Sequence, residues 1–112
     1  MSNTRQEKIA RQIQRDMADI FRKEAAEHLR GVMLTVSAVR VSPDFAYAKI
    51  YVSVFPFERA NDALEVLRNI KGLIRRALGE RVRNQLRIVP EPEFFIDDSL
   101  EYIENIENLL KQ

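Results

Sequence analysis

Apolar residues recur every three or four positions along the first quarter of the chain. They are Ile9, Ile13, Met17, Ile20, Phe21, Ala25 and Leu29. This spacing places them on one face of an α-helix, the face that a globular protein buries. We predict a helix that begins near Arg5 and ends at Gly31, because glycine readily adopts the left-handed conformation that terminates helices.

The pattern changes to a period of two after Gly31. Residues 32–41 are rich in β-branched side chains, and residues 46–55 alternate between an apolar face and a face that carries Tyr47, Lys49 and Tyr51. The segment Ser42-Pro43-Asp44 between them has the composition of a turn, since proline fixes φ and aspartate can accept a bond from nearby backbone. We therefore predict an antiparallel hairpin with one buried face.

Helical spacing returns after Pro56. Across residues 60–77, apolar side chains occupy one half of the helical wheel, while Arg68, Lys71 and Arg75 occupy the other half. Ala77-Leu78-Gly79 then places a glycine in the pattern, and residues 80–86 resume a short helical stretch. We predict a helix, a kink at Ala77-Leu78-Gly79 and a second short helix.

A third strand and a last helix complete the predicted order. Residues 86–96 have the pattern of a strand in which Pro90 and Pro92 cannot donate to a neighbour, so part of it should lie at an edge or form a bulge. Asp97-Asp98-Ser99 has the composition of a helix cap before a last apolar helix. The order α-β-β-α-kink-α-β-α over 112 residues predicts one α+β domain, residues 1–112. We expect a three-stranded sheet with its helices packed on one face.

Charge is distributed unevenly along the chain. The formal net charge of +1 conceals an excess of five positive charges in residues 31–90 and of six negative charges in residues 91–112. Residues 68–87 contain a single acidic residue, Glu80, and seven basic ones: Arg68, Lys71, Arg75, Arg76, Arg81, Arg83 and Arg87. Arginine suits phosphate because its planar fork donates two parallel hydrogen bonds. A helix start near Glu80 would add free backbone amides, so we predict a surface for nucleic-acid backbone. The alternative is a solvated helix face.

Other chemistry has weak support in the sequence. The chain has no cysteine and one histidine, His28, whose place near a predicted helix end suggests a structural role. Asp97 and Asp98 could bind a hard cation, but a helix cap explains them without a metal. Tyr47, Lys49 and Tyr51 could stack RNA bases or simply support neighbouring strands. We expect no catalytic residue and no cofactor.

Three segments resemble a known family over nearly the whole chain. They are Arg5-Gln6-Glu7-Lys8-Ile9 in the opening helix, Val41-Ser42-Pro43-Asp44-Phe45-Ala46-Tyr47-Ala48-Lys49-Ile50-Tyr51-Val52 in the hairpin, and Arg87-Ile88-Val89-Pro90-Glu91, followed by Phe94 and Asp97-Asp98-Ser99-Leu100. In this order they are similar to ribosome-binding factor A, a family of bacterial small-subunit assembly factors. Pro92 departs from the apolar residue that the family commonly has there.

The resemblance implies a type II KH-like fold in which Ala77-Leu78-Gly79 replaces the usual Gly-x-x-Gly. It implies binding to the free 30S subunit and its 16S rRNA, and help in late maturation, 5′-end processing and growth in the cold. Ala77 and Gly79 would form the kink between flanking basic residues that contact rRNA. We expect a cytoplasmic monomer with no small-molecule substrate and no membrane partner.

Two other classes of function stay open from the residues alone. A protein–protein adaptor could use the acidic last segment or a free strand edge. A ribonuclease acting on precursor rRNA would need His28 as its base, because the chain has no other histidine.

Overall fold

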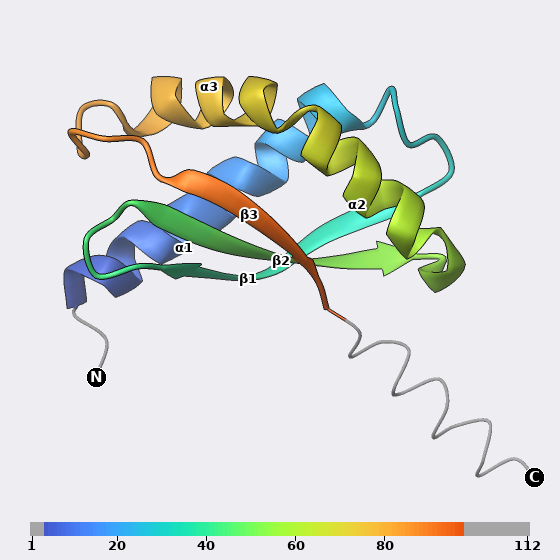
Figure 1. Ribbon diagram of the computed structural model, residues 1–112, viewed down its shortest axis with the longest axis horizontal. Helices are drawn as coiled ribbons and strands as arrows, with labels where there is room; N and C mark the ends of the chain where they lie inside the picture. The colour runs from blue at the N-terminus through green and yellow to red at the C-terminus, as the bar shows by residue number, and fades with distance from the viewer. Residues whose placement is uncertain (1–3, 98–112) are drawn as a thin grey trace, which may run out of the picture.

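The computed structural model describes residues 4–97 of the chain. Helix α1 (Thr4–Ile20) continues into a π-helical turn, η1 (Phe21–Ala25), and is followed by strands β1 (Met33–Val41) and β2 (Tyr47–Phe55). A short 3₁₀ turn, η2 (Phe57–Arg59), leads into helices α2 (Ala60–Asn69) and α3 (Lys71–Val82), and strand β3 (Glu91–Ile96) closes the order. Figure 1 shows these elements along the chain.

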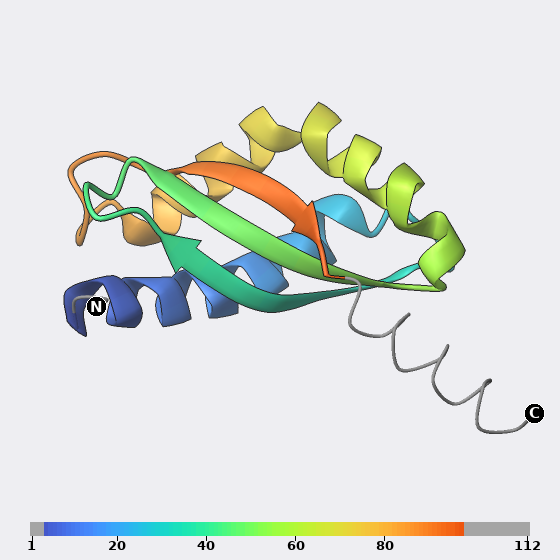
Figure 2. The same ribbon diagram turned by 60° about the horizontal axis from the view of Figure 1, so that its bottom comes forward.

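The strands form one sheet in the order β1-β2-β3, antiparallel between β1 and β2 and parallel between β2 and β3. In β2, Ala48, Ile50, Val52 and Val54 are buried while the residues between them are exposed or half-buried. The helices therefore cover one face of the sheet, which confirms the predicted α+β layering. Helix α1 lies along β1, and α2 and α3 lie toward β3 (Figure 2).

The first helix ends earlier than the sequence pattern indicates. The α-helix stops at Ile20 and the π-helical turn at Ala25, so the prediction that the helix reaches Gly31 is wrong. Buried residues spaced four apart drift by about 40° per step on an ideal α-helix. A wider π-helical turn offsets that drift and keeps Phe21 and Ala25 in the core. Gly31 still adopts the left-handed conformation expected of it, with φ of 77°.

The helix break lies at Ile70, so the predicted kink at Ala77-Leu78-Gly79 is wrong. Ile70 has φ −99° and ψ 16°, and α3 runs without interruption from Lys71 to Val82. Gly79 serves a different purpose, because a Cβ at this position would stand 3.0 Å from Cγ2 of Val89. The glycine thus allows the segment before β3 to approach α3 closely. Glu80 lies inside α3, so the predicted helix start beside it is also wrong.

Strand β3 begins at Glu91, five residues later than predicted, because residues 86–90 form a connection that buries Leu86 and Pro90. The N–H of Glu91 donates to the carbonyl of Ala46, and that of Asp97 donates to the carbonyl of Val52, each at 2.8 Å. Because parallel strands alternate in this way, the nitrogen of Pro92 faces the free edge, where no ladder bond is lost. The predicted edge position is confirmed. The predicted last helix lies outside the described residues.

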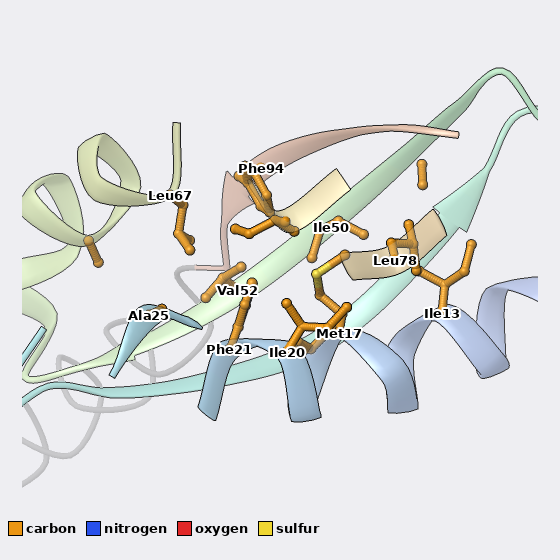
Figure 3. Close-up of a cluster of buried hydrophobic side chains, with 14 of the residues drawn as sticks. Ile13, Met17, Ile20, Phe21, Ala25, Ile50, Val52, Leu67, Leu78 and Phe94 are labelled. Carbon is orange, nitrogen blue, oxygen red and sulfur yellow. The ribbon is translucent and has the colours of Figure 1, made fainter. Parts of the chain in front are cut away.

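The core joins all of these layers. Figure 3 shows Ile13, Met17 and Phe21 facing Ile50 and Val52 of β2, with further side chains from α2, α3 and β3. The rings of Phe21 and Phe94 lie 6.2 Å apart between their centroids, which links the first helix to the last strand. No polar or charged residue is buried within the part of the chain that the structure describes. The charged residues that could carry function are therefore at the surface.

Candidate nucleic-acid interface

The break between α2 and α3 stands beside the free edge of β3. Arg68 at the end of α2 and Lys71 at the start of α3 form one wall of a groove of about 210 Å³, and the other wall consists of Pro92, Glu93, Phe94 and Phe95. We call this the α2–α3 groove. Residues 92–95 were not predicted as part of a site. The proline at an edge strand was the one sequence signal for an accessible edge.

The start of α3 adds backbone donors to this groove. The first amides of a helix have no intrahelical acceptor and carry a partial positive charge. The N–H of Ile74 donates to the carbonyl of Ile70, the residue that precedes α3, at 3.0 Å. Gly72 leaves the space above these amides open, since a Cβ there would meet no atom within 4 Å. The arrangement suits an approaching phosphate oxygen.

The predicted basic residues differ in whether the fold supplies them with a partner. Arg68, Arg76, Arg83 and Arg87 are exposed and form no ion pair within residues 4–97. Their charges are available to an external anion.

Two others have partners that orient them. Nζ of Lys71 lies 3.1 Å from Oε1 of Glu91, and Nη2 of Arg75 donates to the carbonyl of Val89 at 3.2 Å. Both contacts join α3 to β3 or to the connection before it. Both side chains keep donors that these contacts leave unused.

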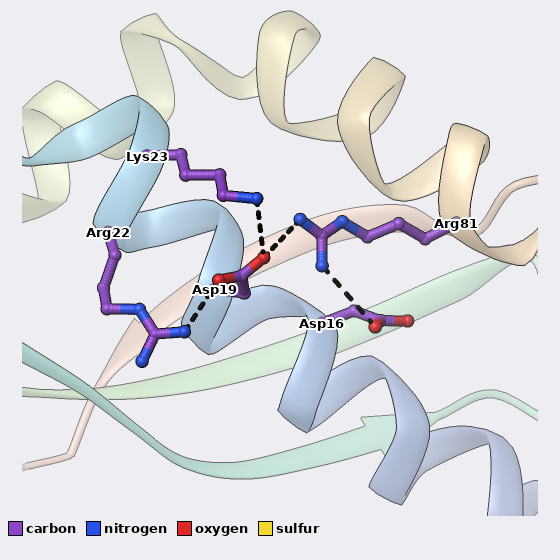
Figure 4. A network of polar contacts seen from close by, with 5 residues as sticks. All are labelled: Asp16, Asp19, Arg22, Lys23 and Arg81. Carbon is purple, nitrogen blue, oxygen red and sulfur yellow. Dashed lines mark hydrogen bonds and ion pairs between the residues drawn. The ribbon is translucent and has the colours of Figure 1, made fainter.

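Arg81 lies apart from the other predicted residues. Its Nη2 is 2.5 Å from Oδ2 of Asp19, and its Nη1 is 3.8 Å from Oδ1 of Asp16, both on α1 (Figure 4). Asp19 also accepts from Arg22 and Lys23. The pKa of the Asp19 carboxyl is held well below its ordinary value, chiefly by Arg22, then by Arg81 and Lys23. Arg81 therefore fastens α3 to α1, and its charge is compensated inside the molecule.

Ala77 and Gly79 also lie away from the break. Both are half-buried within α3, and Gly79 is covered by Val89. Arg68 and Lys71 therefore line the groove together, Arg75 and Arg76 follow further along α3, and Arg81 is held toward α1. Arg83 and Arg87 lie at and after the C-terminal end of α3, away from the groove.

The outer face of the sheet carries the predicted aromatic residues. Tyr51 stacks on Phe95 of β3, with ring centroids 5.5 Å apart, and Tyr47 is exposed on the same face. Lys49 lies between Arg40 and Glu93 in the strand register. Cross-strand support accounts for the Tyr51–Phe95 contact.

The residues considered for other chemistry are dispersed. His28 is exposed in the turn after η1, and Asp98 lies outside the described residues. Among residues 4–97, no three His, Cys, Asp or Glu side chains are arranged to hold a metal ion. None of the helices in that range combines the length and the apolar character needed to cross a bilayer.

The family model and the sequence relatives that match this chain carry the same description. Residues 5–110 match the family described as ribosome-binding factor A. A protein of that name from Flavobacterium johnsoniae is 44% identical over 111 residues, covering 98% of this chain and 85% of the relative. Another from Cytophaga hutchinsonii is 38% identical over 112 residues, covering 100% of this chain and 84% of the relative.

Structures that resemble this fold come from the same family. The crystal structure of ribosome-binding factor A from Thermus thermophilus superposes with a TM-score of 0.70 at 28% identity, covering 81% of this chain and 94% of that one. A Thermus thermophilus homology model fitted into a cryo-EM map of a 30S complex has a TM-score of 0.62 at 31% identity, covering 79% of this chain and 90% of that one.

Proposed function

Since this chain belongs to the ribosome-binding factor A family, we propose that it binds the free 30S ribosomal subunit through 16S rRNA and assists late maturation of that subunit without catalysing a reaction. The complex to which the Thermus thermophilus model was fitted contains the 30S subunit, which supports this partner. The protein would act in the cytoplasm, as a monomer, and without a cofactor or a small-molecule substrate.

The observation that supports this proposal most is the pair of basic residues, Arg68 and Lys71, that lines the α2–α3 groove. Arg68 is exposed without an ion-pair partner among residues 4–97, and Arg75 and Arg76 lie further along the same helix. Phosphate contacts of this kind supply affinity and set orientation without reading the base sequence. Arg83 and Arg87 would extend the contact, while Arg81, Ala77 and Gly79 would hold α3 in place.

Such binding can promote maturation by selecting a conformation. A protein that binds one rRNA arrangement more tightly than another shifts the population toward the first. In this proposal the selected arrangement presents the 5′ end of 16S rRNA to a separate nuclease. Growth in the cold would depend on the factor because misfolded RNA escapes more slowly at low temperature.

Sedimentation of cell extract through a sucrose gradient tests the partner. We expect the protein to migrate with free 30S subunits and not with 70S ribosomes. A protein that stays at the top of the gradient at low salt as well would contradict the proposal. A protein–protein adaptor that used exposed apolar side chains such as Met33 and Phe55 would associate with little dependence on salt, whereas phosphate binding weakens steeply as salt rises.

A pair of charge-neutralising variants tests the site. Arg68→Gln with Arg76→Gln should lower 30S affinity by about tenfold or more. The slope of log affinity against log salt concentration should become shallower by about one to two, since two phosphate contacts are lost. Both side chains are exposed, so the fold should be kept. Arg30→Gln with Arg40→Gln removes two exposed charges that line neither groove and should change affinity little. Equal effects from the two pairs would show that net charge, and not the α2–α3 groove, determines binding.

A further inference from the structure

A second basic groove lies at the opposite edge of the sheet. It has a volume of about 400 Å³ and is lined by Arg11 and Arg15 of α1, by Arg22 of η1 and by Leu34, Thr35 and Val36 of β1. We call it the α1–β1 groove. No carboxylate is among its lining residues. Its strand residues belong to β1, whereas those of the α2–α3 groove belong to β3. Strand β2 lies between these two strands (Figure 2).

The three arginines line the groove in sequence along its helical wall. Arg11 and Arg15 are four positions apart on α1, and Arg22 follows in η1. At 1.5 Å per residue, the Cα atoms of Arg11 and Arg15 are about 6 Å apart along the helix axis. Arg11 and Arg22 stay 68% and 75% exposed, although each also contacts a carboxylate of its own helix. A row of separated cations suits a charged chain better than a compact anion.

Backbone carbonyls of β1 at and beyond the floor of the groove already accept hydrogen bonds from α1. Within the groove, Nε2 of Gln14 donates to the carbonyl of Val36 at 3.2 Å. Further along β1, outside the groove, Nε2 of Gln6 donates to the carbonyl of Val41 at 3.1 Å. These bonds occupy outward carbonyls of edge strand β1. Addition of a peptide strand requires such backbone groups to be free. The groove therefore favours a partner held by the arginine side chains over one held by strand pairing.

The ion pairs nearby leave positive charge in this row. Asp19, the carboxylate that pairs with Arg22, also pairs with Lys23 and with Arg81 of α3. Arg11 is only 3.9 Å from Oε2 of Glu7, and Arg15 has no ion pair within residues 4–97. The ion pair from α3 thus offsets an acidic charge of α1. An anion with spaced charges is the complementary ligand.

We propose that the α1–β1 groove is a second RNA-binding site, and that the protein bridges two RNA segments by holding the phosphates of one segment at each edge of its sheet. The proposal rests on the proposed function in one respect: the α2–α3 groove is taken to hold the first segment. Across β2, the edge strands are separated by about 10 Å, twice the spacing of neighbouring strands. Each groove takes its own segment, so the protein ties together two parts of a folded rRNA.

A bridging assay with two labelled RNA hairpins tests this proposal. One hairpin carries a fluorescence donor and the other an acceptor, each of about twelve base pairs, and energy transfer is measured as full-length protein is added at low salt. We expect transfer to rise and then to fall when excess protein saturates each hairpin separately. Sedimentation velocity should give one protein for two hairpins. A limit of one hairpin per protein would overturn the proposal.

Matched variants locate the second site. Arg11→Gln with Arg15→Gln should abolish energy transfer while one hairpin still binds, and the salt dependence of total binding should become shallower. Both substitutions leave the Asp19 cluster intact. The control pair Arg30→Gln with Arg40→Gln should bridge like the unchanged protein. Persistent bridging by the Arg11 and Arg15 variant would overturn the second site.

Failure of the proposed function gives a different result. If Arg68→Gln with Arg76→Gln leaves one-hairpin affinity and bridging unchanged, the α2–α3 groove is not the first site. Loss of bridging in the Arg11 and Arg15 variant would then still support RNA binding at the α1–β1 groove. If an acidic protein occupied the α1–β1 groove and the number of RNA hairpins bound per protein stayed the same, the bridging proposal would be overturned.

Discussion

Arg81 and Arg76 are both arginines of α3, yet their surroundings give them different uses. Arg76 is exposed without an ion pair in residues 4–97, while Arg81 is held by Asp16 and Asp19 of α1. The sequence pattern gave the two residues equal weight, because α1 is more than 60 positions away from Arg81. An arginine that two carboxylates hold is largely compensated inside the molecule, whereas an exposed arginine without such partners keeps its charge available for RNA.

The Asp19 cluster predicts a specific response of stability to pH. A carboxyl whose pKa is lowered by folding stabilises the folded state above its unfolded pKa, and this contribution is lost as pH falls toward the folded pKa. The free energy of unfolding should therefore be higher for the unchanged protein than for Asp19→Asn at about pH 6, and the difference should shrink as pH falls below about 4. Urea unfolding at several pH values measures it. A difference that stays constant down to about pH 2 would show that Asp19 makes no such contribution.

At the scale of elements, the predicted helix–kink–helix was right in kind and wrong in place. The pattern located a glycine at 79, but the break is at Ile70 and Gly79 faces Val89. A glycine inside a helical pattern can mark either a break or a close approach. The two are distinguished by what lies opposite the missing Cβ, which depends on how the segment before β3 returns over α3.

This distinction predicts opposite effects at two glycines. Gly79→Ala should destabilise the protein by about 1 kcal/mol, because the new Cβ would crowd Val89, whose carbonyl is held by Arg75. In a Val89→Ala background the same change should stabilise by up to about 1 kcal/mol, since alanine favours the helix. Gly72→Ala, where space is open, should be neutral or stabilising in either background. Urea unfolding of these five variants checks the prediction: Val89→Ala, and each glycine change with and without it. A stabilising effect of Gly79→Ala in the unchanged background would contradict it.

At the scale of the molecule, opposite charges are separated along the chain. The basic grooves lie at two edges of the sheet, while residues 98–112 carry four acidic residues and one lysine. Long-range repulsion from these acids should oppose the approach of RNA. Their effect should act on the association rate more than on the bound geometry.

Neutralising part of this acidic segment tests the long-range effect. Glu101→Gln with Glu104→Gln and Glu107→Gln changes the formal net charge from +1 to +4. We expect RNA association at low salt to become several-fold faster, with the gain disappearing near about 1 M salt, where the screening length is about 3 Å. Stopped-flow fluorescence with a labelled hairpin measures the rate. A gain that survives high salt would indicate a direct contact instead.

The order of elements, the buried face of each and the family could be inferred from the sequence, because periodicity and local motifs depend on neighbouring residues. The spacing from Ile9 to Phe21 and the alternation from Ala46 to Phe55 predicted which side chains form the core. The end of α1, the break at Ile70 and the start of β3 could not be located in this way, since tertiary packing determines each of them. The same holds for the second groove and for the difference between Arg76 and Arg81. Local patterns specify which residues must be buried, but only the folded chain determines which distant charges meet and which are left for a partner.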